Sequence, residues 1–210
     1  MQSTQAREMI KPRFMTPIEL IIKRTLDVII SFIVVFAFSP VWLILMLFVW
    51  ADTKASPIYS QTRVGKNGKY FTIYKFRSMR ADAEADGPKL AQKNDLRITP
   101  LGKYLRKYRV DELPQFWNVL IGDMSIVGPR PERPNFTEQL AERSECYSQL
   151  HLVRPGITSW GQVKYGYAEN IDQMLERMVY DLHYIENMSL KMDTRVVIST
   201  VGVVLGGRGQ

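Results

Sequence analysis

Residues 28–51 read VIISFIVVFAFSPVWLILMLFVWA, and none of these 24 residues carries a charge. As one α-helix the stretch would extend about 36 Å, enough to cross a bilayer core of about 30 Å. Trp, Phe, Ile, Val and Leu would cover every face of that helix, a pattern that favours lipid over the core of a soluble domain. The run is too long for a cleavable signal peptide, and no small-residue cleavage site follows it. The sequence therefore predicts a segment that lies in a membrane.

Ser39-Pro40 interrupts this segment near its middle. The parts on either side, 28–38 and 41–50, would each reach only about 15–17 Å as helices. Proline often only kinks a spanning helix, so a kinked span and a re-entrant helical hairpin both fit the break. Basic residues favour the cytoplasmic side and flank both ends of the run: Lys11, Arg13, Lys23 and Arg24 before it, Lys54, Arg63, Lys66 and Lys69 after it. A hairpin leaves both ends in the cytoplasm, and the Ser39 hydroxyl can satisfy a carbonyl freed by Pro40.

The rest of the chain divides at the edges of this segment. Residues 1–15 are polar and basic and are predicted to be disordered. Thr16-Pro17-Ile18-Glu19 matches a capping box with proline at the first helical position, so a helix should begin there. From residue 52 onward the chain has the composition of a soluble domain. We therefore expect three parts, 1–15, 16–51 and 52–210.

The overall composition limits the kinds of partner. The 210 residues carry a net charge of +7, with a pI near 9.5, which suggests nucleic acid, an acidic membrane surface or a phosphorylated substrate. The single cysteine, Cys146, excludes an intrachain disulfide framework. His151 and His183 have no second cysteine with which to complete a zinc site.

The soluble part is predicted to be mostly helical with one small antiparallel hairpin, an α+β fold. Asn67-Gly68 is a strong type I′ turn signal between strands expected near 58–64 and 70–77. Because alternate strand residues share a face, Lys75 and Arg77 should project together from the end of the second strand. Further helices are expected from 100, over 113–121, 135–148 and 171–187, and over an amphipathic or interfacial 193–205, with a short strand over 159–164.

Asp111-Glu112-Leu113-Pro114 ends the helix that Thr99-Pro100 begins. Because proline fits only the first turn of a helix, the two carboxylates should lie at the start of the next one. The simplest interpretation is an acidic cap that complements the helix dipole. Alternatively, carboxylates that cations keep ionised could bind Mg²⁺, or act as nucleophile and base in phosphoryl transfer.

Basic side chains near these carboxylates favour the second interpretation. Arg130 lies between two prolines, which fix the backbone φ on both sides, and arginine binds phosphate through two parallel hydrogen bonds. Arg106, Lys75 and Arg77 supply further cations. A basic surface with aromatics could also bind nucleic acid. However, these residues adjoin the membrane segment and no nucleic-acid module is recognisable, so a phosphorylated lipid or nucleotide is the better partner.

These residues belong to a series of motifs that resembles the catalytic core of the bacterial monotopic phosphoglycosyl transferases, over about residues 22–208. The motifs are Lys23-Arg24-x-x-Asp27, Ser39-Pro40, Tyr74-Lys-Phe-Arg-Ser-Met79, Asp111-Glu-Leu-Pro-Gln-x-x-Asn-Val119, Gly122-Asp-Met-Ser125, Gly128-Pro-Arg-Pro131, Pro155-Gly-Ile-Thr158 and Asp181-x-x-Tyr184. Each motif is weak alone, but this order and spacing are highly specific. The chain is similar to the small, stand-alone members of the family.

The resemblance implies transfer of a sugar-1-phosphate from a UDP-sugar to polyprenyl (undecaprenyl) phosphate, with release of UMP. It implies that Asp111 is the nucleophile of a covalent phosphosugar intermediate and binds Mg²⁺, and that Glu112 assists as acid, base or positioning group. The other implied residues are the phosphate-binding Arg106, Arg130, Lys75 and Arg77, and a supporting Asp181.

The resemblance also implies a place in the cell. Residues 16–51 would form a re-entrant hairpin, broken at Ser39-Pro40, on the cytoplasmic face of the bacterial inner membrane. Residues 52–210 would form a cytoplasmic catalytic domain with interfacial helices. The expected partners are a UDP-sugar, polyprenyl phosphate and the phospholipid membrane, without nucleic acid, and a homodimer is left open.

Two other classes of function are compatible with the residues alone. One is a membrane-anchored adaptor whose basic face binds anionic lipids. The other is a conventional glycosyltransferase that releases UDP. Its evidence is the alternation of Asp82, Glu84 and Asp86, which is similar to an Asp-x-Asp metal site. Most such acidic runs are solvated surface. The sequence does not indicate which sugar is transferred or which glycoconjugate is built.

Overall fold

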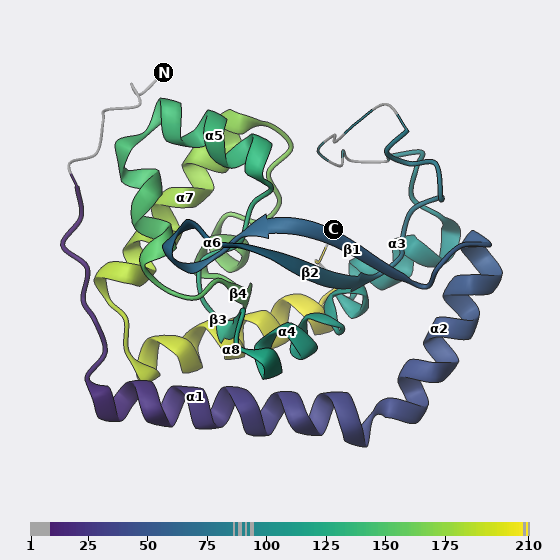
Figure 1. Ribbon diagram of the computed structural model, residues 1–210, viewed down its shortest axis with the longest axis horizontal. Helices are drawn as coiled ribbons and strands as arrows, with labels where there is room; N and C mark the ends of the chain where they lie inside the picture. Colours follow the sequence, from purple (N-terminus) through teal and green to yellow (C-terminus); the bar gives the residue numbers. More distant parts are fainter. Residues whose placement is uncertain are drawn as a thin grey trace.

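A long bent pair of helices forms one edge of the protein (Figure 1). The computed structural model describes residues 9–85, 87, 90, 92, 95–207 and 209. Helix α1 (Pro17–Phe32) begins at the predicted capping box, with the Thr16 hydroxyl and the Glu19 carboxylate each accepting a backbone N–H of the other residue. A π-helical turn (Ile33–Ala37) follows, and α2 (Ser39–Thr53) then turns away by 63°. The helix start and the break at Ser39-Pro40 are therefore confirmed.

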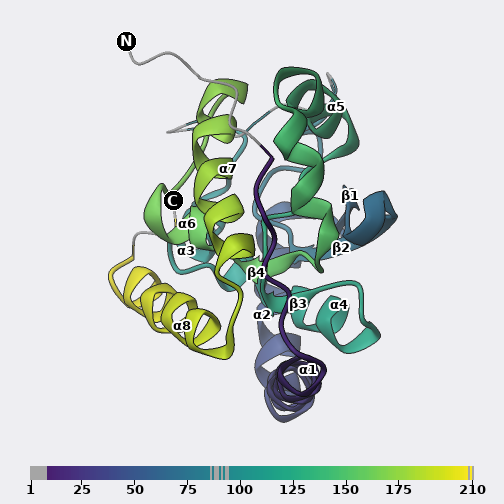
Figure 2. The ribbon, with the colours of Figure 1, turned by 90° about the vertical axis from the view of Figure 1, so that its left-hand side faces the viewer.

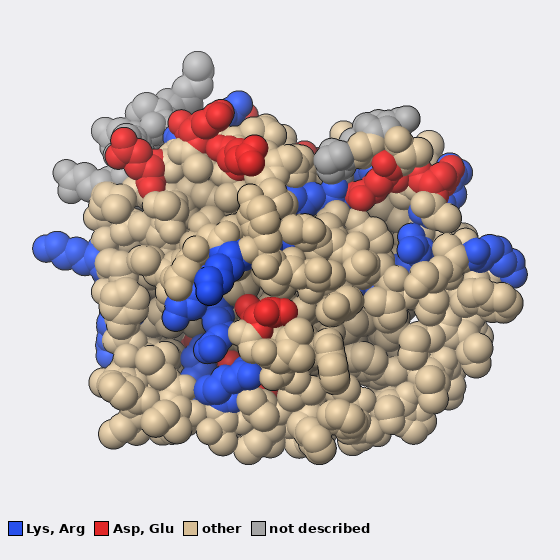
Figure 3. All heavy atoms as spheres, viewed as in Figure 1, with Lys and Arg blue, Asp and Glu red and all other residues tan. Residues whose placement is uncertain are grey.

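A backbone carbonyl at the break has the expected hydrogen-bond partner, because the Ser39 hydroxyl donates to the Phe36 carbonyl at 2.8 Å. In the described part of the chain no single helix is long and apolar enough to cross a membrane. The bent pair Pro17–Ala37 and Ser39–Thr53 has the required length and composition only when its two helices are taken together. Many of the large apolar side chains of this pair are exposed, among them Ile21, Ile29, Phe36, Leu43, Leu47 and Trp50. In Figure 3 the lowest rim of the molecule shows no charged side chain, although basic side chains lie just above it, and acidic ones gather at the opposite edge.

The predicted β-hairpin is confirmed. Strands β1 (Ile58–Val64) and β2 (Tyr70–Phe76) pair antiparallel. Asn67 and Gly68 have φ angles of 56° and 71°, and the Lys69 N–H donates to the Lys66 carbonyl, as a type I′ turn requires.

A second, parallel pair joins β3 (Ser125–Val127) to β4 (Gly156–Thr158). The strand predicted over 159–164 is wrong, because those residues form helix α6 (Trp160–Lys164). The Ser159 side chain caps that helix by accepting the Gln162 N–H at 3.0 Å. The helix-start signal therefore outweighs the apolar pattern in this short stretch.

The remaining elements are mostly helical, which confirms the α+β prediction. They are α3 (Pro100–Lys107), the 3₁₀ turn η3 (Val110–Glu112), α4 (Gln115–Ile121), α5 (Pro134–Arg143), the 3₁₀ segment η4 (Glu145–Leu152), α7 (Ile171–Glu186) and α8 (Leu190–Leu205). The helix predicted over 135–148 ends earlier than expected, and α8 starts earlier. The main core lies between α5, η4, α7 and α8, and includes Leu140, Tyr147, Leu182, Ile185 and Val196.

The residues before α1 are not disordered where the structure describes them, which corrects the prediction for 1–15. Residues 1–8 lie outside the described residues. From Met9 an extended segment runs between α5 and α7 toward α1 (Figure 2). Ile10 and Met15 are buried in the main core, and the Arg13 N–H donates to the Ile185 carbonyl at 3.1 Å. The local composition of residues 1–15 does not predict these long-range contacts.

Polar contacts attach α1 to the rest of the protein, and we call this set the α1 attachment. Three α1 residues, Lys23, Arg24 and Asp27, make its bonds. Lys23 Nζ donates to Asp193 Oδ2 at 2.6 Å, and Asp27 accepts from the Ser125 hydroxyl at 2.7 Å. Further bonds run from Lys23 to the Val127 carbonyl, from Arg24 to the Val119 and Leu120 carbonyls, and from the Ile126 N–H to Asp27.

Candidate active site

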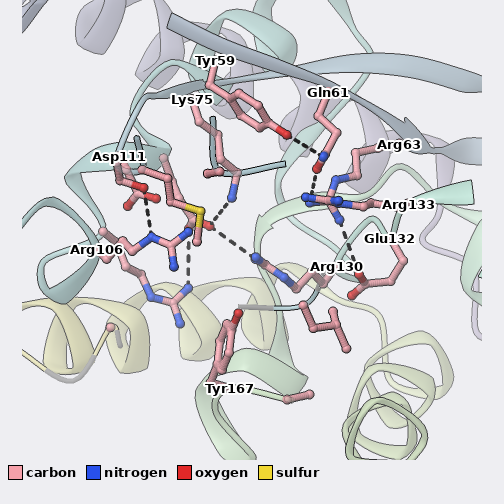
Figure 4. Close-up of a pocket in the computed structure, with 18 of the residues that line it drawn as sticks. Tyr59, Gln61, Arg63, Lys75, Arg106, Asp111, Arg130, Glu132, Arg133 and Tyr167 are labelled. Carbon is pink, nitrogen blue, oxygen red and sulfur yellow. Dashed lines mark hydrogen bonds and ion pairs between the residues drawn. The ribbon is translucent and has the colours of Figure 1, made fainter. Parts of the chain in front are cut away.

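A cavity of about 210 Å³ opens between the β1–β2 hairpin, η3 and the helices α5 to α7 (Figure 4). Among the described residues that line it, nine are basic and four are acidic. The basic ones are Arg63, Lys75, Arg77, Arg80, Arg106, Arg109, Arg130, Arg133 and Arg177. This excess of positive charge in a concave site suits a ligand with several negative charges.

The local backbone places both predicted carboxylates in this cavity. Arg109 adopts a left-handed conformation, with φ 54°, and turns the chain directly after α3. The 3₁₀ turn that follows contains Asp111 and Glu112, both 7 % exposed. Helix α4 begins at Gln115, two residues later than predicted, and no side chain caps it. The interpretation of the two acids as a helix cap is therefore wrong.

Glu112 is the ionic centre of the site. Its Oε1 accepts from Lys75 Nζ at 3.1 Å and from Arg130 Nη1 at 3.3 Å, and its Oε2 lies 3.6 Å from Arg109 Nη1. Burial acts to raise the pKa of Glu112, but these three cations outweigh it and hold that pKa well below its usual range. Glu112 is therefore a fixed negative charge that orders the cations.

Asp111 differs from Glu112 in its contacts. It lines the cavity but has no hydrogen-bond or ion-pair partner anywhere in the described part of the chain. Burial, and then the charge of Glu112, raise the pKa of Asp111, while Lys75, Arg106 and Arg130 offset only part of this increase. The nearby cations were expected to keep both acids ionised. For Asp111, however, desolvation raises the pKa by more than the cations lower it. An unpaired buried carboxylate facing a basic cavity is chemically available to a ligand.

The other predicted residues surround these acids. Arg106 Nε donates to the Ser78 hydroxyl at 2.9 Å, and Arg77 Nε donates to the Ser56 carbonyl at 2.7 Å. Lys75 and Arg77 both reach the cavity, as their alternation along β2 predicted. Every predicted phosphate-binding cation thus lines the same cavity as the two acids.

Asp181 lies behind the cavity wall. It is 3 % exposed and accepts the Gly161 N–H at 2.8 Å and the Arg130 N–H at 3.3 Å. Burial raises the pKa of Asp181 despite these bonds. Asp181 therefore connects α7 to the loop that carries Arg130, a position consistent with its expected supporting role.

Several cavity residues were missed at the sequence level. Glu132 is buried between two arginines, with Arg177 Nη2 at 2.6 Å from Oε1 and Arg63 Nη1 at 3.4 Å from Oε2. Arg63 shares a face of β1 with Tyr59 and Gln61, so the alternation rule that found Lys75 would have found them. Glu132 directly follows the Pro-Arg-Pro loop, but its arginine partners come from distant elements.

The acidic run 82–86 makes no metal centre in the described structure. Asp82 is exposed and pairs with Arg80 at 3.1 Å, and Glu84 pairs with Arg133 and accepts from the Tyr59 hydroxyl. Asp86 lies outside the described residues. No group of three or more His, Cys, Asp or Glu that could hold a metal occurs among the residues described.

The fold and cavity define a class: an α+β protein with a bent apolar helix pair and two adjacent buried carboxylates among lysine and arginine side chains. The sequence profile of the family described as bacterial sugar transferase matches residues 18–207. The chain therefore belongs to the bacterial sugar transferase family, which confirms the resemblance found in the sequence.

Similarity to individual proteins supports the same family membership. The chain is 42 % identical over 194 residues to UDP-N-acetylgalactosamine-undecaprenyl-phosphate N-acetylgalactosaminephosphotransferase of Aeromonas hydrophila, covering 92 % of this chain and 46 % of that protein. It is 38 % identical over 195 residues to UDP-glucose:undecaprenyl-phosphate glucose-1-phosphate transferase of Klebsiella pneumoniae, covering 90 % and 42 %. It is also 38 % identical over 192 residues to exopolysaccharide production protein PSS of Rhizobium leguminosarum bv. phaseoli, covering 87 % and 94 %. The chain spans about half the length of the first two relatives.

Proposed function

We propose that this protein transfers a sugar-1-phosphate from a UDP-sugar to polyprenyl phosphate, releasing UMP and forming a polyprenyl-diphosphate sugar. The observation that carries the proposal is the unpaired Asp111 carboxylate in a cavity lined by nine cations. The names of the Aeromonas and Klebsiella relatives describe phosphosugar transfer to undecaprenyl phosphate, which supports the same class of reaction here.

In the first step an Asp111 oxygen attacks the sugar-side phosphorus of the UDP-sugar. The bond from this phosphorus to the bridging oxygen breaks, and UMP leaves with that oxygen and its electron pair. In the second step a phosphate oxygen of the polyprenyl phosphate attacks the same phosphorus and displaces Asp111. Both nucleophiles react in their anionic forms, so neither step transfers a proton. Lys75, Arg106 and Arg130 stabilise the charge that builds up on the phosphate oxygens.

Glu112 then has a positioning role. Its oxygens face Lys75, Arg109 and Arg130, and its lowered pKa makes it a poor proton acceptor. By fixing these cations around the cavity, Glu112 would prepare the site for the diphosphate before it binds. This role differs from that of an acid or base.

The residues present also fit Mg²⁺. This ion usually keeps several water ligands and binds one or two carboxylates together with substrate phosphates. Asp111 could contribute such a ligand, whereas both oxygens of Glu112 face cations. When bound, the ion would reduce the negative charge of the diphosphate and ease the approach of an anionic nucleophile.

The bent helix pair would place this chemistry at the membrane. We propose that α1 and α2 form a re-entrant hairpin in the cytoplasmic leaflet of the bacterial inner membrane. The exposed apolar side chains, the 63° bend and the basic flanks support this arrangement. In a Cys146→Ser background, cysteines at Gln5 and Ser60 should both resist a membrane-impermeant thiol reagent in intact spheroplasts. Labelling of only one of them would rule out the hairpin.

The reaction is tested by identifying the nucleotide product. Purified protein in lipid nanodiscs, supplied with undecaprenyl phosphate, Mg²⁺ and a panel of UDP-sugars, should release UMP with at least one sugar. Asp111→Asn should abolish this release, and Asp172→Asn, at an exposed carboxylate, should not. UDP as the product would indicate a conventional glycosyltransferase, and no nucleotide release would favour an adaptor.

A further inference from the structure

We propose that the wall of the cavity formed by α5, α6 and α7 binds the uracil base of the nucleotide, and that Gln162 pairs with its imide edge. This inference rests on the proposed function, and it assigns the part of the cavity that the phosphoryl chemistry does not use.

The Gln162 side chain is the main observation. Gln162 is only 6 % exposed and lines the cavity, yet its Oε1 is buried without a hydrogen-bond partner. Among the described residues its side chain makes no hydrogen bond, and its backbone N–H donates to the Ser159 hydroxyl at 3.0 Å. Buried side-chain amides are nearly always paired in folded proteins, so an unpaired one in a cavity wall points to a ligand.

Other unpaired polar atoms gather in the same cavity. Seven buried side-chain atoms lack partners among the described residues, and four of them belong to cavity residues. They are Arg63 Nε, Arg109 Nε, Arg133 Nη1 and Gln162 Oε1. Arg109 lies beside Glu112, whereas Figure 4 shows Arg63 and Arg133 on the opposite side of the cavity from Asp111. The unpaired groups therefore extend well beyond the two acids.

The wall that α5, α7 and the residues before α7 form also carries apolar side chains. Phe136 on α5, Met174 on α7 and Ala168 before α7 line the cavity and belong to the main core. Tyr167 adds a ring that points into the cavity in Figure 4. A flat, uncharged base fits against such a wall, while the diphosphate requires the cations around Glu112.

The hydrogen-bonding groups match uracil in particular. The imide edge of uracil presents a carbonyl, an N3–H and a second carbonyl. Gln162 Oε1 can accept the N3–H while its Nε2 donates to one carbonyl, and Arg133 Nη1 can donate to the other. N3-methylation removes the hydrogen that Gln162 Oε1 would accept and places a methyl group against the amide. The arrangement therefore favours uracil with a free imide over its N3-methyl derivative.

The test compares UMP with N3-methyl-UMP, which lacks the imide hydrogen. By calorimetry on the chain in nanodiscs, the wild type should bind UMP at least tenfold more tightly than N3-methyl-UMP. Gln162→Met should bind UMP and N3-methyl-UMP equally and weakly. Affinity for inorganic pyrophosphate, a probe of the cations, should change less than twofold. Gln139→Met, at an exposed position on α5, should behave as the wild type.

The outcomes separate the two proposals. If Gln162→Met keeps the preference for UMP over N3-methyl-UMP, the uracil assignment is overturned, whereas UMP release would still support the reaction. If the wild type itself does not distinguish these ligands, the assignment is overturned without any variant. The test therefore remains decisive even if Gln162→Met does not fold. If the wild type binds neither UMP nor pyrophosphate and releases no UMP, both proposals fail.

Discussion

The cavity and the α1 attachment are both built from charged side chains withdrawn from water, but they differ in how completely those charges are paired. In the α1 attachment Lys23 meets Asp193, and Asp27 accepts two hydrogen bonds. In the cavity Asp111 has no partner among the described residues, and polar atoms of Arg133 and Gln162 are unpaired. Fully paired buried charges hold the structure together, whereas incompletely paired ones are available to a ligand.

This difference predicts opposite effects of removing charge in the two regions. Neutralising a paired group should mainly lower stability, and neutralising an unpaired group should mainly lower activity. Asp111 and Glu112 allow the same comparison within the cavity, because they are adjacent in sequence but have pKa values shifted in opposite directions.

The largest effect is expected for Asp111→Asn. UMP release should fall by about 10³-fold or more, because the nucleophile is lost. Thermal unfolding should show an unchanged or higher Tm at neutral pH. The raised pKa of Asp111 means that its ionised form destabilises the fold above that pKa, and the substitution removes this charge. A clear fall in Tm would show that Asp111 is a structural, paired group.

Glu112→Gln should be the most destabilising change in the cavity. It leaves three buried cations without their shared carboxylate, at a cost of about 3 kcal/mol in the free energy of unfolding. UMP release should fall roughly tenfold to a hundredfold, since the cations lose their fixed positions. Chemical denaturation and initial rates measure the two effects. If activity disappears as completely as in Asp111→Asn while stability is unchanged, Glu112 acts in the chemistry itself.

In the α1 attachment, Asp27→Asn should cost about 2 kcal/mol of stability, because Asp27 is 5 % exposed and its carboxylate accepts two charge-assisted hydrogen bonds. The rate of UMP release per folded molecule should match the wild type. Asp52→Asn, at an exposed position on α2, is the control. A selective loss of rate in Asp27→Asn would contradict a purely structural role.

Arg130→Lys is expected to have a moderate effect. Lysine keeps the charge but loses the planar fork that contacts phosphate through two hydrogen bonds, so turnover should fall about tenfold. The change in Tm should be small, because lysine can still pair with Glu112. Near-normal turnover would count against phosphate binding by Arg130, and so would a collapse of Tm together with activity.

The dependence on pH should show the smallest effect. Asp111 must be ionised to attack, and burial raises its pKa, so the rate should fall on acidification at a higher pH than an ordinary aspartate would give. The stability contributed by Glu112 has the opposite sign: it is present above the ordinary pKa of glutamate and is lost on further acidification. Rate profiles and pH-dependent unfolding separate these two groups.

Features that depend on local chemistry could be predicted from the sequence. Asn67-Gly68 fixed the hairpin turn, and Thr16 and Thr99 marked two helix starts, because each signal acts within four residues. The two acids and their cations were also found, since proline-bounded and strand-end positions limit where those side chains lie.

Features that depend on packing could not be predicted in this way. Met9 to Met15 looked disordered because their partners, such as Ile185, lie far along the chain. The raised pKa of Asp111 reflects burial that composition does not reveal. Gln162 is one of several glutamines in the sequence, and what distinguishes it is an unpaired amide oxygen together with a position in the cavity wall.

The most direct test of the central claim, attack by an unpaired Asp111, is isotope exchange without an acceptor. Labelled UMP and unlabelled UDP-sugar are incubated with the protein in nanodiscs that contain no polyprenyl phosphate. A covalent phosphosugar on Asp111 makes the first step reversible on its own, so label should appear in UDP-sugar, and Asp111→Asn should abolish this exchange. Exchange that strictly requires the polyprenyl phosphate would mean direct transfer between substrates, and would contradict Asp111 as the nucleophile.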